Sequence, residues 1–390
     1  MNLLITGAAG NLGSHLARHL IAANSNDQPD NQPSIAANRS TYHLNLLIHR
    51  HEPPQDIAQA PSVTIYKADL AKPETLTEPC QNTDCVIHFA GVLFAARPEK
   101  FLPETNTLYA RNVIDAALQA GVKKFILVSF PHVEGKSTPE HPARGILPAG
   151  NPDSAHARTR LAAERYLFEA SANTQMTPIV LRPGMIFSRG ILMIDAARWL
   201  SRRRLLAVWK EPTWIHLLSL PDFLAATQAA IESATARGIY NLGDDQPLTL
   251  QEFLDRAAKV WGITPGIGRH PPRWILQRFR RGESLEENRK ESLEERRRES
   301  LEENCKGSQE ESPPWWEGRP PWRAPRWSFY AAAALTEAFA TIVRTRAPLT
   351  RDFIRIGMAS YTMDTSRMKR ELLPELKYPT LHEGIVLLQG

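Results

Sequence analysis

The amino-acid sequence predicts an α/β protein built on a doubly wound parallel sheet, and three observations support this. Short runs rich in branched apolar residues alternate with helical patterns through the first half of the chain. These runs are apolar throughout, as in strands that helices cover on both faces. A glycine-rich turn directly follows the first run and opens a helical pattern. Such an alternation is typical of a parallel sheet with helices on both sides.

Six apolar runs are the expected strands of this sheet: 2–6, 44–49, 63–68, 85–90, 124–129 and 178–183. The clearest helical patterns between them cover 12–23, 106–121 and 156–172. After Pro183 the pattern changes to helices and short strands, with sheet-like sequence returning near 215–245. We therefore expect a first domain over 1–182, to which strands near 215–245 return, and a smaller C-terminal substrate lobe over 183–390.

Two segments do not fit this alternation of strands and helices. Residues 24–41 form a polar connection far longer than the roughly 2–6 residues usual between a helix and a strand. Residues 280–326 contain three copies of an eight-residue unit at 283–306, ESLEENRK, ESLEERRR and ESLEENCK. A leucine every eight residues drifts about 80° round a helix, so no continuous apolar seam forms. We interpret both segments as surface insertions; a partner-binding arm is the alternative for the repeat.

Composition excludes several functional classes. The 390 residues carry a net charge of only +5, which is not the footprint of a dedicated nucleic-acid binder. Cys80, Cys85 and Cys305 are too few and too badly spaced for a disulfide framework or a zinc site. The longest apolar run, 327–343, contains Glu337 and is short of the roughly 20 residues that a membrane span needs. We expect a cytoplasmic protein with no metal site and no transmembrane segment.

The run ITGAAGNLGSHL is the most informative stretch of the chain. Its glycines follow an apolar strand and open an amphipathic helix. A dinucleotide site needs this arrangement, with a tight turn, close backbone approach to the pyrophosphate and a helix N-terminus facing the anion. The sequence thus predicts a Rossmann-like domain whose cofactor contacts include Gly7, Gly10, Asn11, Leu12 and Gly13.

The GxxGxxG spacing after Thr6 resembles that of the extended short-chain dehydrogenase/reductase family, also called the NAD-dependent epimerase/dehydratase family. Further similar motifs follow in the family's order: ADL (68–70), HFAGV (88–92), the helix around Asn106, LRPGMIFSRG (181–190), IHLLSLPDFLAA (215–226) and YNLGDD (240–245). The resemblance covers about 1–260 well and 345–388 more loosely. It implies that Asp69 and Leu70 lie at the adenine, and that Ala90 and Gly91 pass the ribose and pyrophosphate.

The second expected strand ends in LIHRHE, which bears on the choice of cofactor. An NAD-preferring site usually places an acid there to accept from the ribose hydroxyls. Here His49 and Arg50 hold that place, and a guanidinium suits a 2′-phosphate. We predict NADP, with NAD possible. The alternative is that Arg50 is a solvated end-of-strand residue and that Glu52 serves as the acid.

The run HARTRLAAERYL (156–167) departs from the family pattern. The resembled family has a Ser or Thr after strand five and a Tyr-x-x-x-Lys pair on the next long helix. Aligning the run on Glu164 puts His156 in the tyrosine's place and Arg160 in the lysine's place. None of the eight tyrosines is followed four residues later by lysine. Phe130 falls at the usual serine position, with Ser129 one residue early.

Three hypotheses follow for this altered motif. His156 could exchange protons in place of the tyrosine, with Arg160 binding the ribose and disfavouring the imidazolium. The protein could instead bind NADP(H) without hydride chemistry, as a catalytically silent sensor, assembly factor or scaffold. Thirdly, the chemistry could use residues elsewhere, namely Ser129, His132 or His216.

We favour an oxidoreductase or epimerase-like enzyme with His156, Arg160 and Ser129 as candidate catalytic residues. Its substrate would be a small molecule, and apolar residues of the C-terminal lobe suit a hydrophobic alcohol or ketone better than a sugar nucleotide. These residues are Trp199, Leu205, Leu206, Trp209, Phe339 and Phe353. Members of the resembled family often pair through helices equivalent to 106–121 and 156–172, so a homodimer is possible.

Overall fold

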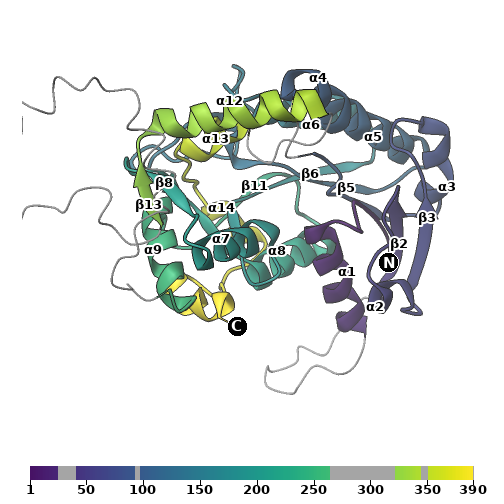
Figure 1. The fold of residues 1–390 in the computed structure, drawn as a ribbon. Coiled ribbons are helices and arrows are strands. Elements are labelled where there is room, and N and C mark those ends of the chain that lie inside the picture. The colour runs from purple at the N-terminus through teal and green to yellow at the C-terminus, as the bar shows by residue number, and fades with distance from the viewer. Residues whose placement is uncertain (25–40, 93–96, 264–320, 344–349, 390) are drawn as a thin grey trace, which may run out of the picture.

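A computed structural model describes residues 1–24, 41–92, 97–263, 321–343 and 350–389 (Figure 1). Nearly all of the polar segment 24–41 and the whole repeat at 283–306 lie outside these described residues. The fold is organised round one seven-stranded sheet in the order β11-β6-β5-β4-β1-β2-β3, and every neighbouring pair of strands is parallel. The strands are β1 (Asn2–Thr6), β2 (His43–Ile48), β3 (Val63–Lys67), β4 (Cys85–His88), β5 (Lys124–Val128), β6 (Thr177–Pro183) and β11 (Gly238–Leu242).

This sheet confirms the predicted fold class. Each of the six expected strands lies within two residues of its predicted limits, and β11 adds a seventh strand from the region near 215–245. The strand order reverses between β1 and β4, since the chain moves outward to β3 before it returns to β4. In open parallel sheets, ligands bind outside the carboxyl ends of the strands at such a switch point.

Helices cover both faces of the sheet (Figure 1). On one face lie α1 (Asn11–Asn24) and α8 (Leu220–Glu232), and on the other lie α5 (Tyr109–Gln119) and α6 (Ala155–Ser171). Along β1, Leu3 and Ile5 enter the core on the side of α1, whereas Leu4 enters the core on the side of α5. The strands are apolar throughout because alternate side chains pack into two different cores.

The described residues after β6, apart from β11 and α8, form small sheets and helices. The strand pairs here are β7 (Met185–Phe187) with β10 (Leu217–Ser219), β8 (Ala207–Trp209) with β13 (Trp322–Ala324), and β9 (Trp214–Ile215) with β12 (Leu248–Thr249). The helices here are α7 (Leu192–Arg202), α9 (Leu250–Val260), α12 (Arg326–Val343), α13 (Arg351–Met358), α14 (Ser366–Glu371) and α15 (Leu381–Gly384). Short helices earlier in the chain are α2 (Gln55–Ala58), α3 (Thr77–Cys80) and α4 (Pro98–Leu102).

Within the described ranges, no helix is both long and apolar enough to cross a membrane. The same part of the chain holds no group of three or more His, Cys, Asp or Glu side chains that could bind a metal ion. Cys80 and Cys85 are buried free thiols, and burial raises the pKa of each to about 12. Cys305 lies outside the described residues.

Candidate functional site

The glycine turn after β1 packs backbone directly against backbone. Gly7 has φ of +72°, and a Cβ atom built there would lie 2.9 Å from the backbone nitrogen of Ala90. A Cβ atom on Gly13 would lie 2.4 Å from the carbonyl oxygen of Gly7, to which Gly10 donates its N–H at 2.9 Å. A side chain at Gly7 or Gly13 would force these segments apart, so the tight turn depends on glycine.

The N-terminus of α1 faces out of this turn. No acidic residue occupies the first helical turn, so the positive end of the helix has no local counter-charge. The Asn11 side chain donates to the carbonyl oxygen of Gly190 at 2.6 Å and accepts from the N–H of Leu192 at 3.4 Å. The helix end expected to hold a pyrophosphate is thus tied to the segment that leads into α7.

The segment after β4 forms the opposite wall of the turn. His88 is fully buried, its Nδ1 lies 2.8 Å from Thr6 Oγ1, and burial followed by the charge of Arg160 lowers its pKa to about 3. At the other end, the side-chain amide of Asn106 pairs with both the N–H of Val92 (2.8 Å) and its carbonyl oxygen (3.0 Å). These contacts hold Ala90 and Gly91 between two fixed points.

Arg160 lies against this wall. A Cβ atom on Gly91 would fall 2.0 Å from Arg160 Nη2, so the guanidinium occupies the space that the glycine leaves. The side chain is only 8% exposed, its Nη1 donates to Val128 at a long 3.5 Å, and its Nε finds no acceptor among the described residues. Burial lowers the pKa of Arg160 to about 10, which leaves it charged at neutral pH. A buried cation with unused donors is suited to a hydroxyl-rich or anionic ligand.

His156 lies one helical turn before Arg160, in the first turn of α6. The N-cap residue Ser154 accepts from the N–H of Ala157 at 3.1 Å, and the Asp352 carboxylate accepts from the N–H of Ala155 (3.1 Å) and of His156 (3.4 Å). The imidazole is 3% exposed, and its Nδ1 has no partner among the described residues. Burial, then the charges of Arg160 and His132, hold its pKa well below the usual value, so the ring is neutral at pH 7.

Phe130 fills the position at which the resemblance puts a serine. Its ring stacks on His132, with centroids 4.6 Å apart, and meets His156 edge-on at 4.7 Å. The His132 ring continues the row to Tyr361 at 4.4 Å, and burial lowers the pKa of His132 to about 4. An aromatic row therefore closes the side of His156 where the family places a hydroxyl.

Two of the alternative residues point elsewhere. The Ser129 hydroxyl donates to Glu164, whose carboxylate pairs with the buried Arg182 at 2.5 Å. His216 uses both ring nitrogens, with Nε2 2.8 Å from the carbonyl oxygen of Asp244 and Nδ1 accepting from the N–H of Met363 at 3.1 Å. The geometry therefore supports a packing role for these two side chains, and only His132 lies beside His156.

The predicted adenosine end gathers residues from three elements. Arg50 is exposed beyond β2, and the Asp69 carboxylate accepts from the N–H of Ala71 at 3.0 Å. The carbonyl oxygen of Leu70 accepts from the Asn112 side chain at 2.8 Å. The Tyr109 phenol donates to Glu104 at 3.2 Å, and its pKa is raised by partial burial, then by Glu104 and Asp69, and is lowered by Arg50. Tyr109 is not among the residues expected from the sequence; its place three residues after Asn106 is the available signal.

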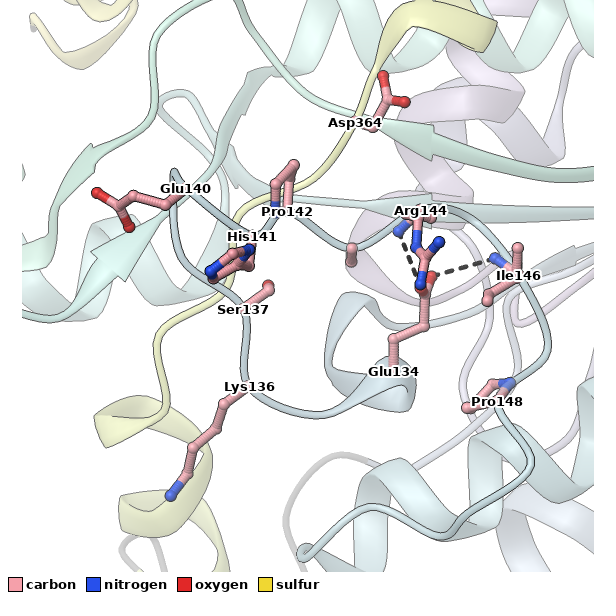
Figure 2. A pocket seen from close by; sticks show the side chains of 11 residues that line it. Glu134, Lys136, Ser137, Glu140, His141, Pro142, Arg144, Ile146, Pro148 and Asp364 are labelled. Carbon is pink, nitrogen blue, oxygen red and sulfur yellow. Dashed lines mark hydrogen bonds between the residues drawn. The ribbon is translucent and has the colours of Figure 1, made fainter.

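The segment between β5 and α6 lines a hollow of about 590 Å³, which Figure 2 shows. Glu134 organises this segment, because its carboxylate accepts from the N–H of Arg144 (2.9 Å), Gly145 (2.9 Å) and Ile146 (3.3 Å). The same carboxylate pairs with Arg182 at 2.5 Å. The hollow shares no lining residue with the group around His156.

Comparison with known proteins agrees with this geometry. The sequence profile described as "NAD dependent epimerase/dehydratase family" matches residues 3–243. A "2-alkyl-3-oxoalkanoate reductase" of Stenotrophomonas maltophilia is 26% identical over 275 residues, which are 67% of this chain and 76% of that protein.

Among solved structures, the UDP-glucose 4-epimerase of Thermus thermophilus in complex with NAD superposes with a TM-score of 0.56 at 22% identity, covering 70% of this chain and 87% of that one. The structure titled gox2253 gives a TM-score of 0.59 at 18% identity, over 95% and 92% of the two chains. At these identities the structures establish the fold.

Proposed function

Because the chain belongs to the NAD-dependent epimerase/dehydratase family, we propose that it binds a nicotinamide dinucleotide in the turn after β1. The backbone from Gly7 to Gly13 would hold the pyrophosphate at the N-terminus of α1. At the opposite wall the Arg160 guanidinium fills the space beside Gly91, and its Nε, which has no acceptor among the described residues, leaves it donor capacity for a ribose. Asp69 and Leu70 would lie at the adenine. The fit rests on the glycine cradle and on the unsatisfied guanidinium.

We further propose an oxidoreductase in which His156 exchanges a proton with the substrate oxygen. A bound nicotinamide supplies the hydride acceptor or donor. The neutral imidazole of His156 can accept a hydroxyl proton, and the adjacent charge of Arg160 favours that neutral form. Arg160 stays protonated and acts by binding. The placement of His156 one turn before Arg160, with Arg160 on Gly91, is the observation that carries this proposal.

The substrate class we propose is a hydrophobic alcohol or ketone. The Phe130 ring meets His156, and the Tyr361 ring lies beyond it against His132. The reductase of Stenotrophomonas maltophilia, 26% identical over the aligned 275 residues, is named for an alkyl-substituted 3-oxoalkanoate. Trp209 belongs to the buried core, whereas Trp199 and Leu205 are 51% and 59% exposed on the outer surface. Leu206 and Phe353 are half-buried, and the side chain of Phe339 lies outside the described part of the structure, so the lobe residues expected to line the substrate site do not share one environment.

A silent cofactor-binding protein is the second candidate, and Phe130 favours it. Its ring takes the serine position and packs on His156, which is 3% exposed. Substrate oxygen would reach the imidazole only after the Phe130 ring turns aside. If the ring stays in place, the protein binds the dinucleotide without turnover.

Turnover of medium-chain ketones with NADPH, followed by the absorbance of the reduced nicotinamide, separates the two candidates. The enzyme proposal expects wild-type turnover that His156→Phe reduces by about 10²–10⁴-fold, the usual contribution of a positioned acid–base group, with NADPH affinity retained. The double variant His156→Tyr, Arg160→Lys restores the family pair. Adding Phe130→Ser to this double variant also restores the family's hydroxyl. If this triple variant turned over substrate and the wild type did not, the wild type would be a silent binder. Unchanged turnover in His156→Phe would end the case for this residue.

Cofactor preference is tested separately at Arg50. A guanidinium bonded to a 2′-phosphate contributes about 1.5–3 kcal/mol, so we expect Arg50→Ala to weaken NADPH binding by about 10–100-fold and to leave NADH binding unchanged. Arg18→Ala is the matched control, since Arg18 is also partly exposed but pairs with Asp56 at 2.5 Å. Equal affinities for the two nucleotides in wild type and variant would remove Arg50 from the cofactor site.

A further inference from the structure

Helix α7 carries large apolar side chains that face solvent. Leu192 is 63% exposed and Trp199 is 51% exposed, whereas Ile194 and Ser201 on the same helix are buried. Leu205, just beyond the helix, is 59% exposed. The buried side chains anchor α7 to the body of the protein, and the outer face is left with a leucine and a tryptophan that a water-facing helix does not need.

These apolar residues share their face with arginines. At about 100° per residue, Leu192, Trp199 and Arg203 fall within about 40° of one another round the helix axis. The Arg203 guanidinium lies 3.9 Å above the Trp199 ring. We call this surface the α7 face; it comprises Leu192, Trp199, Arg202 and Arg203, and the exposed Leu205 follows it just beyond the end of the helix.

A hollow of about 520 Å³ beside the α7 face concentrates the positive charge. Its lining consists of Arg189, Gly190, Asp195, Arg198, Trp199, Arg202 and Arg203. The single acid, Asp195, accepts from the N–H of Gly190 at 3.3 Å. No carboxylate forms an ion pair with any of the four lining arginines within the described part of the chain. The hollow therefore presents net positive charge, which the single carboxylate of Asp195 offsets only in part.

We propose that the α7 face docks the protein on the surface of an anionic lipid bilayer. An amphipathic helix lies in the membrane interface with Trp and Leu among the acyl chains and basic residues at the phosphates. Arginine side chains also pair with phosphate oxygens in a planar, bidentate way. The exposed apolar residues and the uncompensated arginines then have one common explanation.

Two other occupants account for less of this surface. A second copy of the chain, joined through the same face, would bring arginines opposite arginines across a two-fold axis, and like charges there oppose association. A soluble polyanion would satisfy the arginines but leave Leu192, Trp199 and Leu205 in water. The bilayer proposal does not depend on catalysis, so it can fail or hold independently of the proposed function.

Co-sedimentation of the full chain with vesicles tests the proposal. We expect binding to vesicles of phosphatidylglycerol and phosphatidylcholine in equal parts, little binding to pure phosphatidylcholine, and weaker binding at high salt. Each basic residue near such a surface contributes about 1 kcal/mol, so Arg202→Glu with Arg203→Glu should reduce partitioning at least about twentyfold. Arg202→Lys with Arg203→Lys keeps the charge and should retain most binding, and Trp199→Ser should weaken the binding that remains at high salt.

The matched control is Lys72→Glu with Lys123→Glu, which changes the net charge equally at two exposed positions outside α7. Circular dichroism establishes that each variant is folded. Equal loss of binding in the control and in the arginine variant would overturn the proposal, as would failure of wild type to bind anionic vesicles. Sedimentation velocity tests whether a second copy of the chain occupies the α7 face. If the wild type formed an oligomer that only the α7 variants dissociate, and bound no vesicles, the face would be a dimer interface and the bilayer proposal would be wrong.

Discussion

Asp244 is a buried carboxyl whose surroundings favour its protonated form. It is 1% exposed, and its Oδ1 lies 3.7 Å from Nε2 of the buried His216. Burial raises its pKa to about 8; interaction with the backbone of Gln246 lowers it in part, and the nearby charges of Asp245 and Asp222 raise it. The acid is therefore largely protonated in the folded state at neutral pH and ionised in the unfolded chain.

This difference gives a pH-dependent prediction for Asp244→Asn. The pKa of Asp244 is higher in the folded protein than in the unfolded chain. Its contribution to the free energy of unfolding is therefore most favourable below pH 4 and is lost as pH rises towards 8. The variant does not titrate, so its stability relative to wild type should increase by about 2–3 kcal/mol between pH 5 and pH 7 and then level off above pH 8. Urea unfolding at these pH values measures it.

Asp245→Asn serves as the control, because Asp245 is partly exposed and pairs with Lys369 at 2.5 Å. An exposed pair contributes at most about 1 kcal/mol, and we expect no comparable rise with pH. A pH-independent difference between wild type and Asp244→Asn would contradict the buried, protonated carboxyl.

For single residues, the sequence predicts the positions of those side chains that belong to a local motif. The glycines of the first turn and the positions of His156 and Arg160 on α6 followed from local spacing and family resemblance. The hydrogen-bond partners of the residues around this site could not be predicted from local spacing. Asp352 reaches the start of α6 from almost 200 residues away, and nothing near His156 in the sequence announces it. Ser129 turns to Glu164 because a buried ion pair needs its hydroxyl, which a local pattern cannot reveal.

At the scale of elements, α6 depends on two residues at its start. Ser154 caps the helix, and the Asp352 carboxylate adds a negative charge at the positive end of the helix. We expect Ser154→Ala to lower the free energy of unfolding by about 1 kcal/mol and Asp352→Asn by about 0.3–1 kcal/mol. Chemical unfolding at neutral pH measures both.

Asp153→Asn is the comparison for the second variant, since Asp153 is exposed just before the helix and, among the residues that the structure describes, accepts hydrogen bonds only through its backbone carbonyl. If Asp352→Asn cost no more than Asp153→Asn, the tie between α13 and α6 would not stabilise the helix.

Element boundaries also show where local pattern gives way to tertiary contacts. The helix expected over 106–121 begins its regular part at Tyr109, after a wider turn over Pro103–Leu108. Within that turn, Asn106 uses its amide to hold Val92 from both sides. The strand expected over 124–129 ends at Val128, where the side chain of Ser129 turns to Glu164. Both boundaries lie beside side chains with distant partners, although the Ser129 N–H still donates to the Leu181 carbonyl oxygen of β6 at 2.8 Å.

For the whole molecule, the sequence predicts the sheet better than what lies beside it. Six of the seven parallel strands follow from buried apolar runs, each of which is a local signal, and the seventh comes from the sheet-like sequence near 215–245. The smaller region is held by pairings between distant segments, such as β13 with β8 and α13 with the start of α6. These pairings have no periodicity of their own, so the sequence indicated only that helices and short strands occur there.

The proposed function depends on dinucleotide binding in the turn after β1, and calorimetric titration of the full chain with NADPH tests this binding. We predict saturable binding at one site, with the free energy of unfolding raised by about 2.7 kcal/mol at a ligand concentration of about 100 times Kd. Gly10→Ala should weaken binding, because its Cβ atom would lie 2.9 Å from the carbonyl oxygen of Gly7, whereas Gly150→Ala meets open space and should not. A folded protein that binds none of NAD⁺, NADH, NADP⁺ or NADPH would contradict the proposed function.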